Sequence, residues 1–456
     1  MTKPDAGLLR HLRLPSATGL VVASMIGAGI FTTTGFQAAA LGHPAYIFSL
    51  WIVGGVLAFC GALAFAELGA ALPRAGAEYV YIRESFGPLL AFISAFVALF
   101  AGFSAPIAAA LKLLVEYLRH FVPLFESNPS LVGGVALNDL VAVAIAWALV
   151  GLHAWGARRG MRFSDAITAL KVFGIVLIIL AAFSLGDGSA ANLTYVSESY
   201  YELSLLDKYS AVATSLIFVT FCYMGWNGAA YMAAEMPEPQ RTLPRSLMLG
   251  TALVTLLYLL LNGVFFYGGN VDVLAGRPDV GLVAAQRLFG STGISLVTAV
   301  MAVSILASAS AMTALGPRVY YAFGQDFARL SILARADEAT GAPRPALILQ
   351  GLVTTAIIFS GRIDQILIYA GFTLTLFSSL AVACVVALRR RRPELERPFR
   401  VPLYPAPIVL YLGVSMWTLV WAVRARPIES LLALLTAVAG GGFFYLMRGR
   451  RGPVAE

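Results

Sequence analysis

The chain has 456 residues, of which 59% are hydrophobic and 12% are charged, and its mean hydropathy is +0.81. A soluble protein carries about 25% charged residues, so this composition excludes an ordinary soluble globular fold. Apolar runs of about 20 residues recur along the whole chain, as in helical proteins that cross the membrane many times. The net charge of +8 does not indicate nucleic-acid binding, because the basic residues lie in short loops between apolar runs.

Charged, proline and glycine residues divide these runs into predicted membrane-spanning helices. Twelve spans are expected, near residues 16–40, 45–71, 87–118, 137–156, 163–185, 209–234, 245–268, 292–324, 345–360, 363–388, 405–423 and 428–447. The fold class is therefore an all-α polytopic membrane protein. The first run lacks a small-residue cleavage site, so we expect no removable signal peptide. The sequence leaves the oligomeric state open.

The basic residues favour one orientation in the bilayer. Of the 32 Lys and Arg residues, 23 fall in the termini and the loops on their side, and 7 fall in the opposite loops. Because basic loops stay in the cytoplasm, both termini are predicted to be cytoplasmic, in a multi-pass protein of the cell membrane.

The first predicted span contains a weak point at Gly27-Ala28-Gly29. Glycine costs a helix interior roughly 1 kcal/mol relative to alanine, so these residues favour a local opening of the helix. An opened helix at membrane depth is tolerated only where its freed backbone groups face a cavity or other protein. The pattern therefore favours a transporter with a binding site at this break.

The sixth predicted span repeats this weak point, because residues 221–228 hold two glycines and an asparagine among aromatic residues. One interpretation is that the glycines only allow close helix packing, as small residues do in membranes. Two interrupted spans, five spans apart, instead favour a shared binding site near the middle of the membrane.

Several motifs, in chain order, resemble those of the amino acid–polyamine–organocation transporters. They are Gly-Ala-Gly-Ile-Phe at 27–31, Ala-Glu-Leu-Gly at 66–69, and the segments 72–81, 224–227, 235–245 and 392–399. Ala77 departs from the family, in which a second glycine is common at this place. Within the superfamily the chain is most similar to the L-type and prokaryotic amino acid transporter branch.

The resemblance implies a 5+5 inverted repeat with discontinuous first and sixth helices, followed by two extra helices. The implied parts are a cytoplasmic tail at 1–15, a first repeat at 16–208, a second repeat at 209–392, helices eleven and twelve with their preceding cytoplasmic loop at 393–447, and a cytoplasmic tail at 448–456. It also implies alternating access and no enzymatic activity. The scattered histidines and cysteines lack the spacing of a metal site, so we expect neither a metal nor a cofactor.

An amino acid substrate needs hydrogen-bond donors for its carboxylate and acceptors for its ammonium group. We expect the N–H groups of Gly27, Ala28 and Gly29 to bind the carboxylate, because the second half of the opened helix begins there with its positive dipole end. The carbonyl of Met25, before the break, is the expected acceptor for the ammonium group.

The resemblance adds acceptors from the sixth span, namely the carbonyls near Phe221, Cys222 and Met224. It also makes the Phe221 ring a gate that closes the site from outside. The alternative is that Phe221 is an ordinary phenylalanine facing lipid or the core.

The pocket for the substrate side chain is expected to be apolar or mildly polar. Its candidate residues are Phe100, Ser104, Cys222, Tyr223 and Asn262. No Asp or Glu lies mid-membrane in spans one, three, six, eight or ten, so a neutral amino acid is preferred to a cationic one. The role of Asn262 stays open between a pocket residue and a helix–helix hydrogen bond. Two alternative functions are an amine or polyamine antiporter, and a sensor or accessory protein that binds amino acids without moving them.

Lys171, about eight residues into the fifth span, is the sharpest single-residue hypothesis. Intramembrane lysines are costly and usually functional, and burial disfavours the charged form of an amine. The resemblance places its ammonium group where sodium-coupled relatives hold sodium, which implies proton coupling or sodium-independent exchange. The alternative is a lysine that snorkels to the interface. Lys112 is expected to form a structural pair with Glu116, four residues later.

Charges also gather near the predicted cytoplasmic side. Glu67, Glu78, Arg74 and Arg83 surround the second cytoplasmic loop, and Glu235 stands near Arg241 and Arg245. These side chains are either solvated charges or a network that closes an inner gate. The arginine-rich segment 389–400 is interpreted as an anchor for lipid headgroups.

Overall fold

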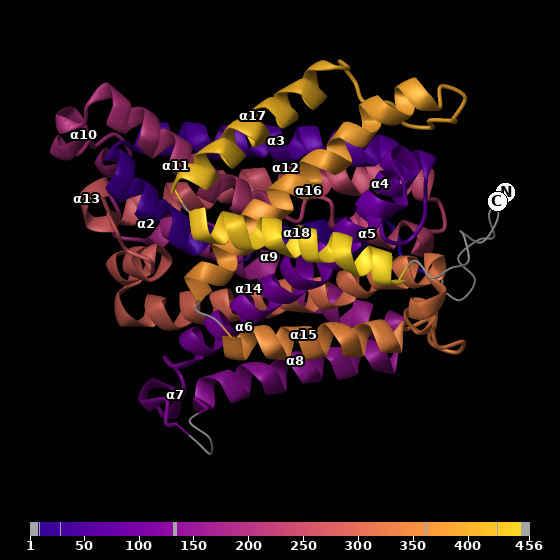
Figure 1. The fold of residues 1–456 in the computed structure, drawn as a ribbon. Coiled ribbons are helices and arrows are strands. Elements are labelled where there is room, and N and C mark those ends of the chain that lie inside the picture. The colour runs from indigo at the N-terminus through magenta and orange to yellow at the C-terminus, as the bar shows by residue number, and fades with distance from the viewer. Residues whose placement is uncertain are drawn as a thin grey trace.

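The computed structural model describes residues 8, 10–27, 29–130, 135–360, 363–425 and 427–447, which fold into a bundle of helices (Figure 1). The helices of the first half are α1 (Leu14–Met25), α2 (Ile30–Leu41), α3 (Pro44–Ala71), α4 (Glu78–Phe86), α5 (Pro88–Val97), the π-helix η1 (Ala98–Ser104), α6 (Ala105–Leu118), α7 (Leu124–Ser127), α8 (Leu137–Trp155), α9 (Ala157–Leu185), the 3₁₀-helix η3 (Ala190–Leu193) and α10 (Glu198–Glu202).

The second half continues the all-helical pattern. Its helices are α11 (Leu205–Tyr223), the 3₁₀-helix η4 (Gly228–Glu235), α12 (Pro239–Gly268), α13 (Val271–Leu274), α14 (Val280–Asp326), the 3₁₀-helix η5 (Ala328–Ala334), α15 (Arg344–Ser360), α16 (Ile363–Arg391), α17 (Ala406–Ala425) and α18 (Pro427–Met447).

The polytopic all-helical fold is confirmed. Among the described residues, 10 helical segments are long and apolar enough to cross a membrane, and the pair α1 and α2, bent by 42°, makes an eleventh if counted as one span. The predicted span at 345–360 coincides with α15, an apolar helix of 17 residues. The count of twelve spans stays a prediction.

The first and sixth predicted spans are both interrupted, as the glycines indicate. The first is divided between α1 and α2, and the sixth between α11 and η4. The sequence did not anticipate α4, which lies in the expected loop after the second span, or the part of α14 from Val280 to the kink at Gly290 (φ +67°), which precedes the apolar span Gly293–Asp326. Helices were predicted only where the sequence has an unbroken apolar run. These two helical segments lie outside such runs.

Two groups of helices meet at α1. In one group α12 packs against α3, and α3 also contacts α11. In the other, α14 packs against α6 and α9, and α8 packs against α15. Helix α1 contacts α12, α9 and α14, so the break at its end lies where both groups come together. Figure 1 shows α8 and α15 side by side at one edge of the bundle and α17 at the opposite edge.

One end of the bundle is rich in arginine, and we call it the arginine-rich side. It is formed by α4, the end of α14 and the connection between α16 and α17, and it lies at the right in Figure 1. On this side the buried Glu67 of α3 accepts hydrogen bonds from Arg389 Nε (2.8 Å) and Nη2 (2.6 Å) and from the Val401 N–H (2.7 Å). Arg397 Nε lies 3.6 Å from the same carboxylate.

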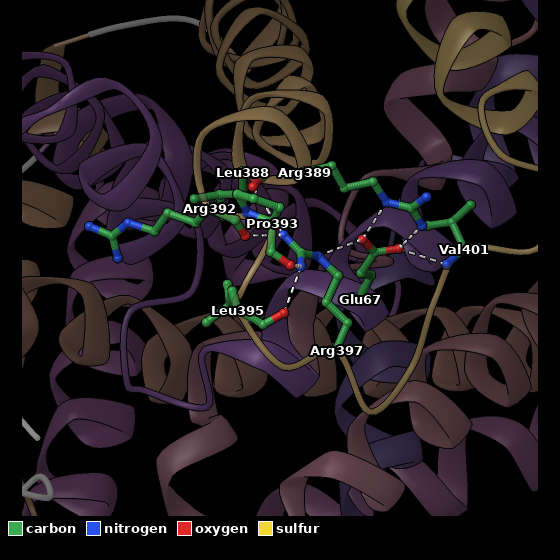
Figure 2. A network of polar contacts seen from close by, with 8 residues as sticks. All are labelled: Glu67, Leu388, Arg389, Arg392, Pro393, Leu395, Arg397 and Val401. Atoms are coloured by element: carbon green, nitrogen blue, oxygen red, sulfur yellow. Dashed lines mark hydrogen bonds and ion pairs between the residues drawn. The ribbon is translucent and has the colours of Figure 1, made fainter.

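Arg397 also binds the end of α16. Its guanidinium donates to the carbonyls of Leu388 (3.0 Å), Arg392 (2.9 Å) and Leu395 (2.6 Å), as Figure 2 shows. The Leu388 carbonyl lies in the last turn of α16 and also accepts the Arg392 N–H (2.9 Å), whereas Arg392 and Leu395 follow the end of the helix. Arg397 therefore binds the C-terminal end of α16 together with the connection after it. The carboxylate of Glu67 thus fastens the α16–α17 connection to α3. Arg389 and Arg397, predicted to face lipid headgroups, are bound to protein instead.

We expect Glu67→Gln to destabilise the protein by about 3 kcal/mol, because it leaves Arg389 and Arg397 without their compensating charge. The measurement is the apparent melting temperature of the purified protein in detergent. The matched control is Glu238→Gln, because Glu238 pairs with Arg241 at 3.9 Å with both side chains exposed. An exposed pair of this kind contributes at most about 1 kcal/mol. Equal melting temperatures for the two variants would contradict the expected role of Glu67.

Candidate functional site

The first helix opens between Met25 and Ile30. Ile26 has an extended backbone (φ −77°, ψ 99°), and its N–H still donates to the Val22 carbonyl (3.0 Å). Gly29 precedes α2, and its carbonyl accepts the N–H of Thr33 (2.9 Å). The structure therefore confirms the break at the predicted glycines. Ala28, one of the three predicted carboxylate donors, lies outside the described residues.

The sixth helix opens between Tyr223 and Gly228. Met224 has ψ 143°, and Gly225 has φ +104°, a conformation that side-chain-bearing residues rarely adopt. A Cβ atom on Gly225 would lie 2.6 Å from the carbonyl carbon and oxygen of Ser24 in α1. Glycine is thus required here both for the turn and for close approach of the two broken helices.

The two breaks are in direct contact. A Cβ atom on Gly29 would lie 2.6 Å from Cys222 Sγ, and Cys222 Sγ lies 3.2 Å from Thr33 Oγ1 of α2. The structure therefore brings together the predicted residues from both breaks. The thiol of Cys222 thus packs against Gly29 and the start of α2.

A tyrosine that the sequence analysis did not identify joins the two breaks. The hydroxyl of Tyr258, on α12, lies 2.7 Å from the Met25 carbonyl and 2.9 Å from the Cys222 carbonyl. Both carbonyls were predicted acceptors for an ammonium group. One hydroxyl has a single proton to donate, so it serves one carbonyl fully at a time. Tyr258 lies four residues before Asn262, on the same face of α12. This spacing from a candidate pocket residue could have identified Tyr258 from the sequence.

Lys171, on α9, binds the end of α1. Its Nζ donates to the carbonyls of Ala23 (3.2 Å) and Ile26 (2.6 Å), and the residue is fully buried. These carbonyls belong to the last turn of α1, where the helix dipole is negative and carbonyls lack helical partners. The side chain points into the protein, and this position does not fit the snorkelling alternative.

Asn262 forms contacts between helices. Its Oδ1 accepts from Thr34 Oγ1 of α2 (2.6 Å), and its Nδ2 donates to the Tyr258 carbonyl (2.8 Å). Both polar atoms of the amide have protein partners, which favours the helix–helix alternative. Its role as a substrate contact stays a prediction.

Phe221 is half-buried and lies against α16. A Cβ atom on Gly371 would lie 3.2 Å from the Phe221 ring, and the Phe221 carbonyl accepts the Met224 N–H (3.0 Å). Phe100 and Ser104, the pocket candidates from the third span, lie in the π-helix η1. Such short π segments are frequent at functional sites, and nothing in the apolar run predicted one here.

One pairing expected from the sequence, that of Lys112 with Glu116, is wrong. Lys112 pairs with Asp139 at the start of α8 (2.7 Å), while Glu116 pairs with Arg119. Lys112 also donates to the Ile358 carbonyl of α15 (3.0 Å), so its side chain lies between helices rather than along its own. Sequence spacing shows neighbours along one helix and cannot show which residue of another helix lies closer.

Glu235 stands near Arg241 and Arg245 in the sequence, and the interpretations left open were solvated charges or an inner-gate network. It pairs with neither Arg241 nor Arg245 but with Arg318 of α14, whose Nε lies 2.7 Å and Nη2 3.3 Å from its carboxylate oxygens. Both side chains are at most 2% exposed. The Glu235 carbonyl also accepts the N–H groups of His11 and Leu12 (2.9 Å each). Arg318 lies inside the predicted span 292–324. A charged residue within a span needs a buried partner, so its position could have indicated such a pair from the sequence.

Glu235, Arg318 and the start of α1 therefore close the arginine-rich side beneath the breaks. A second connection lies nearby, where Asp326 at the end of α14 pairs with Arg83 of α4 (3.2 Å). Arg83 was expected in such a network, and its partner comes from a helix far away in the sequence.

Comparisons with known proteins agree with this architecture. The family model described as amino acid permease matches residues 12–444. The b(0,+)-type amino acid transporter 1 of Mus musculus is 28% identical over 444 residues, which cover 96% of this chain and 88% of that protein. The cystine/glutamate transporter of Homo sapiens is 27% identical over 448 residues, covering 96% and 85% of the two chains. The large neutral amino acids transporter small subunit 2 of Mus musculus is 25% identical over 443 residues, covering 96% and 81%.

These matches extend over nearly the whole chain and include both broken helices. They confirm the resemblance inferred from the motifs. The chain belongs to the amino acid permease family of the amino acid–polyamine–organocation superfamily.

Proposed function

We propose that this protein is a secondary active transporter that moves a neutral L-amino acid across the cell membrane by alternating access. The observation that carries the proposal is the convergence of the Met25 and Cys222 carbonyls on the Tyr258 hydroxyl. Carbonyls from two opened helices meet at one point beside the start of α2. This arrangement offers acceptors for an ammonium group, with a helix N-terminus for a carboxylate close by.

The α-amino and α-carboxyl groups bind the opened backbone. The ammonium group takes hydrogen bonds to the carbonyls of Met25, Cys222 and Met224, and the carboxylate receives the N–H groups of residues 27–29. The start of α2 suits an anion because its N–H groups and dipole point toward it. Phe221 covers this site from the side opposite to the arginine-rich side.

The preference for a neutral side chain follows from the buried charges. The Asp and Glu residues that are buried in the described part of the chain are Glu67, Glu78 and Glu235, all on the arginine-rich side. None belongs to α1, α2 or α11. A cationic substrate side chain would therefore enter the site without a carboxylate partner, at a high desolvation cost. The names of the relatives refer to several classes of amino acid. The preference for a neutral substrate therefore rests on the residues of this chain.

Lys171 supplies the coupling. Its ammonium group holds the end of α1 where a bound cation would otherwise be needed, so transport does not require sodium. When α1 moves during opening, the amine loses the Ala23 and Ile26 carbonyls and gives up its proton. Transport is then driven by protons or proceeds as sodium-independent exchange. The arginine-rich side faces the cytoplasm, and the Glu235–Arg318 pair keeps it closed in this state.

The proposal is tested with purified protein in liposomes. We expect uptake of a radiolabelled neutral amino acid, independent of sodium, and stimulated by an inward proton gradient or by the same amino acid inside. A panel of neutral, cationic and acidic amino acids and a polyamine serves as competitors. Stronger competition by the polyamine or by lysine would replace the proposal with the amine antiporter. Binding of an amino acid without any uptake or exchange would support a sensor instead.

Lys171→Ala is expected to abolish the pH dependence of transport and to reduce its rate, because α1 loses the ammonium group that binds its last carbonyls. The initial rate of uptake is measured at several external pH values. Lys208→Ala is the control, since Lys208 lies in the first turn of α11, over the Tyr200 ring, at the end of that helix remote from the break. A Lys171→Ala variant with an unchanged pH profile would remove this residue from the coupling mechanism.

Tyr258→Phe is expected to raise KM about tenfold, because the hydroxyl holds the Met25 and Cys222 carbonyls at one point, and without that bond, which is worth on the order of 1–3 kcal/mol when buried, the carbonyls move away from the positions that bind the ammonium group. The ring is retained and keeps its edge contacts with Trp51 and Tyr223. The control is Tyr369→Phe, which removes a hydroxyl bonded to Thr436 of α18 rather than to a carbonyl of either break. Similar KM values for both variants would show that the bridging hydroxyl does not organise the site.

A further inference from the structure

Glu78, the first residue of α4, is a buried carboxylate without a cationic partner among the described residues. It is 8% exposed, and its Oε2 accepts a hydrogen bond from the Tyr231 hydroxyl (3.0 Å). Glu67 and Glu235, the other two carboxylates buried in the described part of the chain, are each paired with arginine. A buried carboxylate that lacks a counter-charge is strongly disfavoured in its ionised form.

A chain of hydrogen bonds connects Glu78 to the break in the sixth helix. Asn227, within the break, donates from Nδ2 to the Tyr231 hydroxyl (3.1 Å), and that hydroxyl donates to Glu78. All three residues are buried. The two bonds join η4, just beyond the break, to α4 on the arginine-rich side. A second contact, from the Gly76 N–H to the Tyr231 carbonyl (3.2 Å), holds the same two segments together.

The groups that face Glu78 are neutral. They are Tyr231 from η4, Cys384 from α16 and Tyr411 from α17, and Tyr81 of α4, next to Tyr231 and Cys384, is neutral as well. The charged groups of the packed elements are engaged elsewhere: Arg83 with Asp326 of α14, Arg74 and Arg392 with Glu84, Arg389 with Glu67, and Arg391 with the Ser85 carbonyl. Among the described residues of α5 there is no titratable side chain.

The electrostatic consequence follows from this setting. Burial raises the pKa of Glu78 to about 7, although the hydrogen bond from Tyr231 acts in the opposite direction. Water that enters between α4 and η4 would remove the burial and return the carboxyl toward its ordinary acidity. The closed arrangement therefore binds a proton that the open arrangement releases.

We propose that Glu78 is a proton-binding site that controls opening of the arginine-rich side. Its protonated form accepts the Tyr231 hydrogen bond without a buried charge and keeps α4 against η4. Loss of the proton places an unpaired charge between them and favours their separation. This site is distinct from Lys171, and the inference rests on the alternating-access function proposed above.

The sign of the effect is fixed by proton linkage. A group with a raised pKa in the closed state stabilises that state at acidic pH, and this stabilisation is lost as the pH rises. From about pH 6 to about pH 8, the equilibrium constant for opening should increase about tenfold, using the ordinary carboxyl pKa for the open state. Opening of the arginine-rich side is therefore favoured by alkaline pH on that side.

The test measures opening directly, without transport. Ala233, fully buried in η4, is replaced by cysteine, and its reaction with a membrane-impermeant maleimide is followed across this pH range. Labelling of the native buried cysteines is subtracted using the protein without the new cysteine. The same measurement is made with Glu78→Gln added, which mimics the protonated carboxyl. The ratio of the two rates removes the pH dependence of the thiol itself.

We expect this ratio to rise about tenfold from about pH 6 to about pH 8. Glu84→Gln, on the same helix, is the matched control and should preserve the pH dependence of the parent, because Glu84 has arginine partners. A second variant, Tyr231→Phe, removes the bond that favours the charged form, so its labelling curve should move to higher pH. A ratio that is flat with pH, or an unmoved curve for Tyr231→Phe, would overturn the proposal.

The two proposals can fail separately. Labelling that follows the expected curve in a protein that neither imports nor exchanges amino acids would reject the transport function and retain the proton site. Transport with labelling that is insensitive to Glu78→Gln would do the reverse.

Discussion

The structure depends on one constraint, which is that backbone groups released inside a membrane must find partners within the protein. Opening the first and sixth helices releases carbonyls where lipid offers no donor. The structure provides donors from two other helices, the ammonium group of Lys171 on α9 and the hydroxyl of Tyr258 on α12. These two side chains therefore lower the cost of keeping the breaks open inside the membrane.

The same two donors explain why the site can be both stable and exchangeable. The Tyr258 hydroxyl is shared between two carbonyls, so each keeps capacity for a further donor. An incoming ammonium group can take up that capacity without first breaking the contacts that hold the helices. Lys171 instead binds α1 from the side of α9, and movement of α1 between the two helix groups must break its bonds.

At the arginine-rich side, buried carboxylates rather than backbone carbonyls need partners. There Glu67 and Glu235 are paired with arginines from helices distant in sequence, and each pair ties two segments together. Buried pairs of this kind contribute little net stability but make separation of their partners costly, which suits a gate. Glu78 lacks such a partner and is hydrogen-bonded to a neutral tyrosine. Its buried charge is therefore removed by protonation of the carboxyl group rather than balanced by an arginine. The side is thus held by two kinds of contact, of which one responds to pH.

The amino-acid sequence was enough to predict the membrane class, the approximate spans, the two breaks and the family. These follow from local causes: apolar length, the helix cost of glycine, and motifs that stand in order along the chain. It also identified Lys171, because a lysine in an apolar run is costly wherever it points. The partners could be seen only once the helices were packed together: Tyr258 for the carbonyls, Arg318 for Glu235 and Asp139 for Lys112. Each of these contacts joins helices far apart in sequence, and which faces meet is fixed by packing, which spacing along one helix does not record.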